Sequence, residues 1–150
     1  MLALQIDPAG RVERIDLPVE PVLWHRAVVT RLSGSPDRAS YHRRALMWVH
    51  GSGADEGLLP NLTATALASA WRGIDIGSSY FLYGRVIVTG AEDGDVVQLG
   101  EDLAGQAQAV AEAVVARRTA WQTQQPASNE VAWAEILQSA LAVRPGSSAQ

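Results

Sequence analysis

The sequence from Met47 to Asn61 reads MWVHGSGADEGLLPN and joins a strand-like segment to the start of a helix. The segment that enters it, Tyr41 to His50, is predicted to be a strand whose side chains alternate between two faces. Both faces are apolar, which predicts a central strand. One face carries Leu46, Trp48 and His50, and the other carries Ala45, Met47 and Val49.

The second half of this stretch predicts a turn followed by a helix. Glycines and acids from Gly51 to Gly57 are typical of a turn. Asn61 is a favourable N-cap residue, so a helix is expected over 62–72, and Gly73 stands where a helix-ending glycine belongs.

The remaining elements follow from periodicity and turn residues. They are, in chain order, a hairpin over 2–17, a short helix within 22–32 that leads into an irregular arm, a strand over 80–89 with a bulge or close approach at Gly84, a turn over 90–94, a strand over 95–99, a helix over 101–121, a linker over 123–127 and a last helix from Ser128 or Asn129 to about Val143.

These elements predict an α+β fold in a single domain, with a mixed or antiparallel sheet, helices packed on it and a C-terminal helix. The expected organisation is an α+β domain over 1–122, a linker and helix over 123–143, and a disordered tail over 144–150.

Composition narrows the possible functions. The chain has 150 residues, of which 47% are hydrophobic and 19% charged, as is typical of a globular domain. It has no cysteine, which excludes disulfides, thiolate metal sites and a cysteine nucleophile. The net charge of −4 argues against nucleic-acid binding. No stretch is long and apolar enough for a membrane helix, and the N-terminus lacks a basic leader, so a cytoplasmic protein is expected.

The most informative cluster is an arginine-rich arm. Five arginines and one acid, Asp37, lie between Arg26 and Arg44, although the chain as a whole is acidic. Guanidinium groups bind carboxylates and phosphates through paired hydrogen bonds, and a nearby tyrosine can stack on a base or an arginine. An anionic ligand, a nucleic acid or an acidic partner, such as a second copy, is therefore predicted to bind the arm, and a solvated arm without a partner is the alternative. The residues concerned are Arg38, Tyr41, Arg43 and Arg44.

The turn that follows His50 is the second candidate site. Its glycines resemble a nucleotide loop, but Asp55 and Glu56 would repel a phosphate and Pro60 delays the helix. Ser52 beside His50 lacks the sequence elbow of a serine nucleophile, and the histidines show no metal-ligand spacing. No catalytic residue, metal or cofactor is therefore predicted. A small-molecule pocket near His50, Ser52 and Asn61 remains an alternative.

The C-terminal helix is predicted either to fold back on its own domain or to form a homodimer. A polar linker precedes it, and its apolar side chains could pack in either way. These are Trp133, Ile136, Leu137 and Leu141.

Three segments together resemble a family of small uncharacterised proteins (a domain of unknown function) found in phages, plasmids and chromosomes of actinobacteria and other bacteria. They are Ala3 to Gly10, Gly57 to Asn61 with Ala64 and Thr65, and Gly84 to Gly90. The arginine-rich insert over 33–44 and the helix after Pro126 depart from that pattern. The resemblance implies a bacterial accessory or mobile-element setting and transfers no activity. Taken together, the sequence predicts a non-enzymatic interaction protein that binds a protein or anionic partner through the arm.

Overall fold

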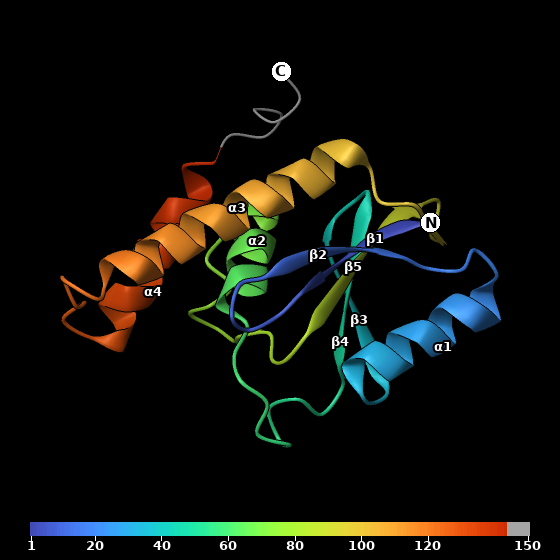
Figure 1. The fold of residues 1–150 in the computed structure, drawn as a ribbon, viewed down its shortest axis with the longest axis horizontal. Coiled ribbons are helices and arrows are strands. Elements are labelled where there is room, and N and C mark those ends of the chain that lie inside the picture. Colours follow the sequence, from blue (N-terminus) through green and yellow to red (C-terminus); the bar gives the residue numbers. More distant parts are fainter. Residues whose placement is uncertain (144–150) are drawn as a thin grey trace.

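A computed structural model of the chain describes residues 1–143, and the predicted tail over 144–150 lies outside the described residues. The described part forms an α+β fold with one open sheet and helices on both of its faces (Figure 1). Its elements are β1 (Leu2–Ile6), β2 (Val12–Asp16), α1 (Pro21–Leu32), β3 (Pro36–His42), β4 (Ala45–His50), α2 (Leu62–Arg72), β5 (Val86–Glu92), β6 (Asp95–Val97), α3 (Glu101–Ala120) and α4 (Asn129–Leu141).

All strand pairs are antiparallel, and the strand order is β2-β1-β5-β4-β3, with β6 pairing with β5. The predicted N-terminal hairpin is confirmed, since Leu2 pairs with Asp16 and Ile6 with Val12. β4 lies between β3 and β5, which confirms that it is an interior strand.

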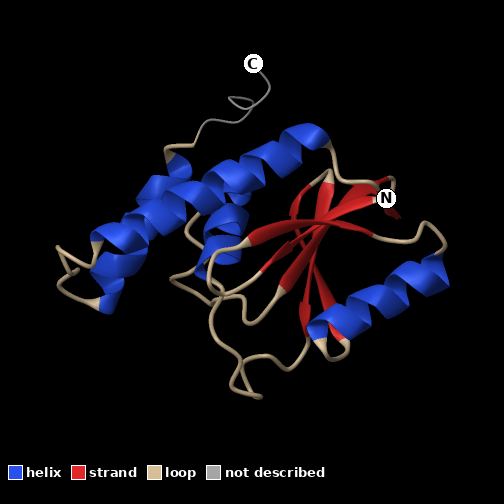
Figure 2. Cartoon of the chain, viewed as in Figure 1, coloured by secondary structure: helices blue, strands red, loops and turns tan. Residues whose placement is uncertain are grey.

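The alternation of β4 divides the core into two layers. Leu46 and Trp48 join a cluster under α1, whereas Ala45 and Met47 join the larger cluster under α2, α3 and α4. Figure 2 shows α1 on one side of the sheet and the other three helices on the opposite side. The sheet is therefore covered on both faces, as the apolar alternation predicts.

The predicted helix signals are confirmed at both ends of α2. The Asn61 side chain accepts a hydrogen bond from the Ala64 N–H at 2.9 Å, and Gly73 ends the helix in a left-handed conformation. α4 likewise begins at Ser128, whose hydroxyl accepts from the Val131 N–H.

Two predicted strands have wrong boundaries. The segment predicted as one strand from Tyr41 to His50 contains the end of β3, a turn at Arg43 and Arg44, and β4. The arm predicted to be irregular is thus largely an edge strand. Its polar residues hide the strand pattern, because an edge strand needs fewer apolar side chains than an interior one.

The second correction concerns the strand predicted from Tyr80. β5 starts only at Val86, and residues 80–85 precede it outside any strand, with a single bridge between Tyr83 and Pro60. Gly84 has φ of 75°, a conformation that interrupts a strand, and Leu58 packs in the space beside it. The predicted close approach at Gly84 is confirmed. The turn predicted over 90–94 is confined to Asp93 and Gly94, because β5 continues through Glu92.

Candidate functional site

The structure distributes the residues of the arm instead of gathering them in one patch. Arg38 lies on β3, opposite Trp48, and is exposed, as is Arg43 in the turn. Arg44 is paired with Asp102, with Nη2 and Oδ2 2.8 Å apart, and this pairing lowers the pKa of the Asp102 carboxyl. Tyr41 is buried, and its hydroxyl lies 2.8 Å from that of Tyr80. Arg38 and Arg43 therefore remain available to a partner at the surface.

The residues predicted around the 50–61 turn do not form a common pocket. His50 accepts the Ser52 N–H at Nδ1 (3.0 Å), and its Nε2 lies 3.1 Å from the Glu56 carboxylate. Its ring packs against Gly34, where an added Cβ would collide with it. Contacts within the chain therefore occupy both ring nitrogens of His50.

Asn61, the third residue of that predicted pocket, has a structural role. It is fully buried, and its amide donates to the carbonyls of Ile6 and Gly84, both at 2.9 Å. The structure therefore places His50 and Ser52 in one cluster of contacts and Asn61 in another. The sequence could not show this, because the partners of Asn61 lie 55 and 23 residues away.

A groove does exist beside this turn, lined by the end of α1, residues 57–59 and the residues just ahead of β5. Figure 1 shows that α1 and β4 end, and β5 begins, at the same end of the sheet. We call this groove the basic groove. Its volume is about 420 Å³. It is lined by Pro8, Arg31, Leu32, Ser33, Gly57, Leu58, Leu59, Gly84 and Arg85.

The charge of the basic groove comes from two arginines, and no acidic residue lines it. Arg31 Nη1 donates to Gln5 Oε1 at 3.0 Å, and Arg85 Nη1 donates to the backbone carbonyl of Arg31 at 3.3 Å. Each guanidinium carries five N–H donors, so these contacts fix its position and use only a small part of its capacity. Within the described residues, neither arginine forms an ion pair.

Apolar side chains also line the basic groove. Leu58 packs over Gly84, where an added Cβ would lie 2.8 Å from Leu58 Cδ1. Leu59 stands beside it with 69% of its surface exposed. The groove therefore presents guanidinium donors next to aliphatic side chains, which suits an anionic group attached to an apolar one.

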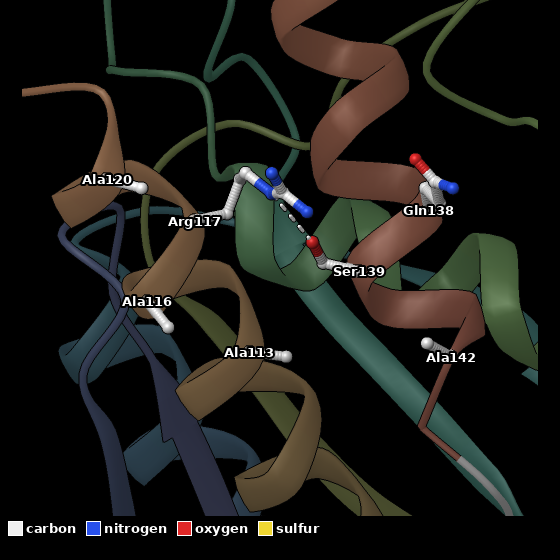
Figure 3. Close-up of a pocket in the computed structure, with 7 residues that line it drawn as sticks. All are labelled: Ala113, Ala116, Arg117, Ala120, Gln138, Ser139 and Ala142. Atoms are coloured by element: carbon white, nitrogen blue, oxygen red, sulfur yellow. Dashed lines mark hydrogen bonds between the residues drawn. The ribbon is translucent and has the colours of Figure 1, made fainter. Parts of the chain in front are cut away.

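A larger cavity of about 510 Å³ lies between α3 and α4, but its chemistry is less distinctive (Figure 3). Three alanines of α3 and Ala142, which follows α4, form most of its walls. Its charged residue, Arg117, donates from Nε to Ser139 Oγ at 3.2 Å and lies 3.6 Å from the Glu135 carboxylate. The charge of this guanidinium is thus already paired with a carboxylate of α4.

α4 folds back onto its own domain, one of the two arrangements predicted for it. Trp133 and Ile136 are buried in the core of the same chain. Trp133 stacks edge-to-face on Phe81, and its indole N–H donates to Asp75 at 2.8 Å. These two residues are therefore unavailable to a partner. Leu137 is partly buried and Leu141 is half exposed, so a dimer through α4 stays a prediction.

Sequence reasoning did not single out Arg31 and Arg85 as a pair. Arg31 was only one member of the basic arm region, and Arg85 belonged to a predicted strand. The only local signal was Gly84, whose left-handed backbone turns the chain beside Arg85.

In residues 1–143, no three His, Asp or Glu side chains lie close enough together to hold a metal ion. None of the helices there is both long enough and apolar enough to span a membrane. No family model, curated protein or solved structure matches the chain. The resemblance noted from its sequence therefore stays a prediction.

Proposed function

We propose that the protein is a non-catalytic binding protein that holds an anionic group in the basic groove. The observation that carries this proposal is the pair Arg31 and Arg85 in a groove without a lining carboxylate, in a chain whose net charge is −4. An overall acidic protein repels anions at long range. Two arginines without a neighbouring carboxylate therefore make this groove a local place where an anion is attracted.

The chemistry of the groove points to a carboxylate or phosphate that bears an apolar group. A guanidinium matches the geometry of both anions by donating two parallel hydrogen bonds. Leu58 and Leu59 would contact the apolar part. The volume of about 420 Å³ falls within the range of small-ligand sites, roughly 300–1,000 Å³.

The test is a titration followed by NMR of the arginine side-chain Nε–H and leucine methyl signals. The probes are inorganic phosphate, acetate and hexanoate. We expect all three anions to shift the Arg31 and Arg85 signals and hexanoate alone to shift the methyls of Leu58 and Leu59. Stronger binding of hexanoate than of acetate would identify an apolar carboxylate, whereas preference for phosphate would identify a phosphorylated ligand.

Matched variants distinguish binding at this site from general electrostatic attraction to the protein surface. Arg85→Gln and Arg31→Gln should each weaken binding about 10-fold, because a hydrogen bond to a charged group contributes roughly 1.5–3 kcal/mol. Arg43→Gln removes the same charge from an exposed turn and should leave binding unchanged. Equal effects of all three substitutions would contradict the proposal and indicate only bulk electrostatics.

The interaction role of the arm is a second candidate, favoured by the exposure of Arg38 and Arg43. The cytoplasmic location and the accessory or mobile-element setting stay predictions from the sequence.

A further inference from the structure

β3 is a free edge of the sheet, since it pairs only with β4 in the strand order. The Gly51 N–H donates to the Ser35 carbonyl at 2.9 Å, which places the backbone groups of Ser35 toward β4. Backbone groups alternate in direction along a strand, so those of Asp37 also face β4 and those of Arg38 face outward. The edge therefore offers the N–H and C=O of Arg38 to another extended segment.

A groove of about 280 Å³ runs beside this edge. One wall is β3 itself, and the other is the segment that follows α2. Ile74 and Tyr80 are 58% and 49% exposed there, although both are large apolar side chains. The groove is lined by Ala39, Ser40, Tyr41, Arg72, Ile74, Asp75, Ile76, Ser79 and Tyr80.

The geometry fits a segment that adds to the sheet as a further strand. Successive side chains of a strand point to opposite faces, so every second side chain of an added segment would lie over the groove. The Tyr41 and Tyr80 hydroxyls, 2.8 Å apart, join the two walls of the groove. This mode of recognition takes its affinity from the backbone and its selectivity from the pockets for alternate side chains.

The charges along the edge select the partner. Arg38, Arg43 and Arg72 are exposed, and within residues 1–143 none of them forms an ion pair. Asp75, which also lines the groove, already accepts hydrogen bonds from Trp133 Nε1 and from Ser78. Asp37 directly precedes Arg38 on β3, and its side chain lies on the opposite face of the strand, against Gly51. The local charge complements an acidic segment.

The same charges disfavour a second copy of the chain at this edge. Antiparallel pairing of two β3 strands about Arg38 would place like charges opposite one another, which destabilises a sheet. Pro36 and the irregular register between Ala39 and His42 further limit unselective pairing, as is usual on protected edges.

We propose that the free edge of β3 and its adjoining groove bind an extended acidic peptide segment of a partner protein by strand addition. Apolar side chains of the segment enter the groove beside Ile74 and Tyr80, and the alternate carboxylates lie on the opposite face of the sheet, beside Arg38. This site is separate from the basic groove, and its test does not depend on anion binding there.

The experiment uses the full chain and three capped eight-residue peptides. One alternates glutamate with valine, the second alternates lysine with valine, and the third is the acidic peptide with a central proline. Hydrogen exchange followed by NMR reports on individual amides. We expect the acidic peptide to slow exchange of the Arg38 amide, the basic peptide to leave it unchanged, and the proline to weaken binding at least 10-fold.

Variants test the edge and the charge separately. Arg38→Pro removes the outward N–H without removing a bond to β4, so the sheet should tolerate it while peptide binding falls more than 10-fold. Arg38→Gln keeps the outward N–H and should weaken binding about 3- to 10-fold through the lost charge, and Arg11→Gln, an exposed arginine in the β1–β2 turn, should not change it. Thermal unfolding of each variant shows whether the fold is retained, and Arg38→Gln replaces Arg38→Pro if the latter unfolds.

Three results would overturn the proposal. The first is equal binding of acidic and basic peptides. The second is no protection of the Arg38 amide at a peptide concentration of about 1 mM, where even a weak complex is populated. The third is a dimer in sedimentation experiments that Arg38→Pro or Arg38→Gln dissociates, which would assign the edge to a second copy.

Discussion

Asn61 shows how one side chain can connect three distant segments. Its Oδ1 accepts from the first turn of α2, and its Nδ2 donates to the carbonyls of Ile6 at the end of β1 and Gly84 ahead of β5. The residue is fully buried, so none of these groups can turn to water instead. The residue therefore holds together the end of the sheet on which the basic groove is built.

Asn61→Ala should lower the free energy of unfolding by about 3–5 kcal/mol, because it removes a cap and leaves buried backbone groups without a partner. Ser128→Ala is the matched comparison, since Ser128 caps α4 at an exposed position and its loss should cost about 1 kcal/mol. Urea unfolding of both variants checks this. A similar cost for the two would show that the bonds to Ile6 and Gly84 contribute little.

At the scale of elements, α4 is held by the contact of Trp133 with the segment that follows α2. The indole packs on Phe81 and on the backbone of Gly77, and it donates to Asp75. Gly77 has no left-handed backbone, so it is needed here for space and not for conformation.

Gly77→Ala should displace the Trp133 ring and lower the free energy of unfolding by about 1–3 kcal/mol, the usual cost of overpacking. Hydrogen exchange should become faster in α4 while the amides of β4 and β5 stay protected. Gly73→Ala is the control: it meets no atom within 4 Å but requires a left-handed backbone, so its cost of about 1 kcal/mol should fall on α2. Unchanged exchange in α4 of Gly77→Ala would contradict this account.

At the scale of the whole molecule, three carboxyls couple stability to pH. The pKa of Asp75 is lowered by the Ser78 hydroxyl and the Trp133 indole, that of Glu101 by Arg14, and that of Asp102 by Arg44. A lowered pKa in the folded state means that the unfolded chain binds protons first as pH falls. The stability from these groups is therefore complete above the ordinary carboxyl pKa of about 4 and is lost as pH falls through the folded-state values.

We expect the free energy of unfolding to decrease below about pH 4, as measured by urea unfolding between about pH 6 and pH 3. Salt should reduce the share of this decrease that comes from Glu101 and Asp102, because their ion pairs with Arg14 and Arg44 are exposed and salt screens them. The share that comes from Asp75 should persist in salt, since its hydrogen-bond donors, Ser78 and Trp133, are neutral. The Asp75→Asn variant should lose this share of the pH dependence. A pH dependence that salt abolishes entirely would assign no role to Asp75.

The sequence by itself determined the elements whose signals are local. The hairpin turn at Asp7 to Gly10, the caps of α2 and α4, and the two-faced alternation of β4 all depend on residues within a few positions of one another. The class of the fold follows from these elements, because a sheet strand that is apolar on both faces needs helices on both sides.

Only the tertiary structure decided which segments meet. The polar β3 is a strand because β4 offers it a partner, and β5 starts at Val86 because Leu58 occupies the space at Gly84. Arg31 and Arg85 are 54 residues apart, yet the carbonyl of one accepts from the guanidinium of the other. Such contacts depend on chain closure and packing over long distances in sequence, which no local pattern encodes. For this reason the local elements could be predicted from the sequence, whereas both proposed binding sites became visible only in the folded chain.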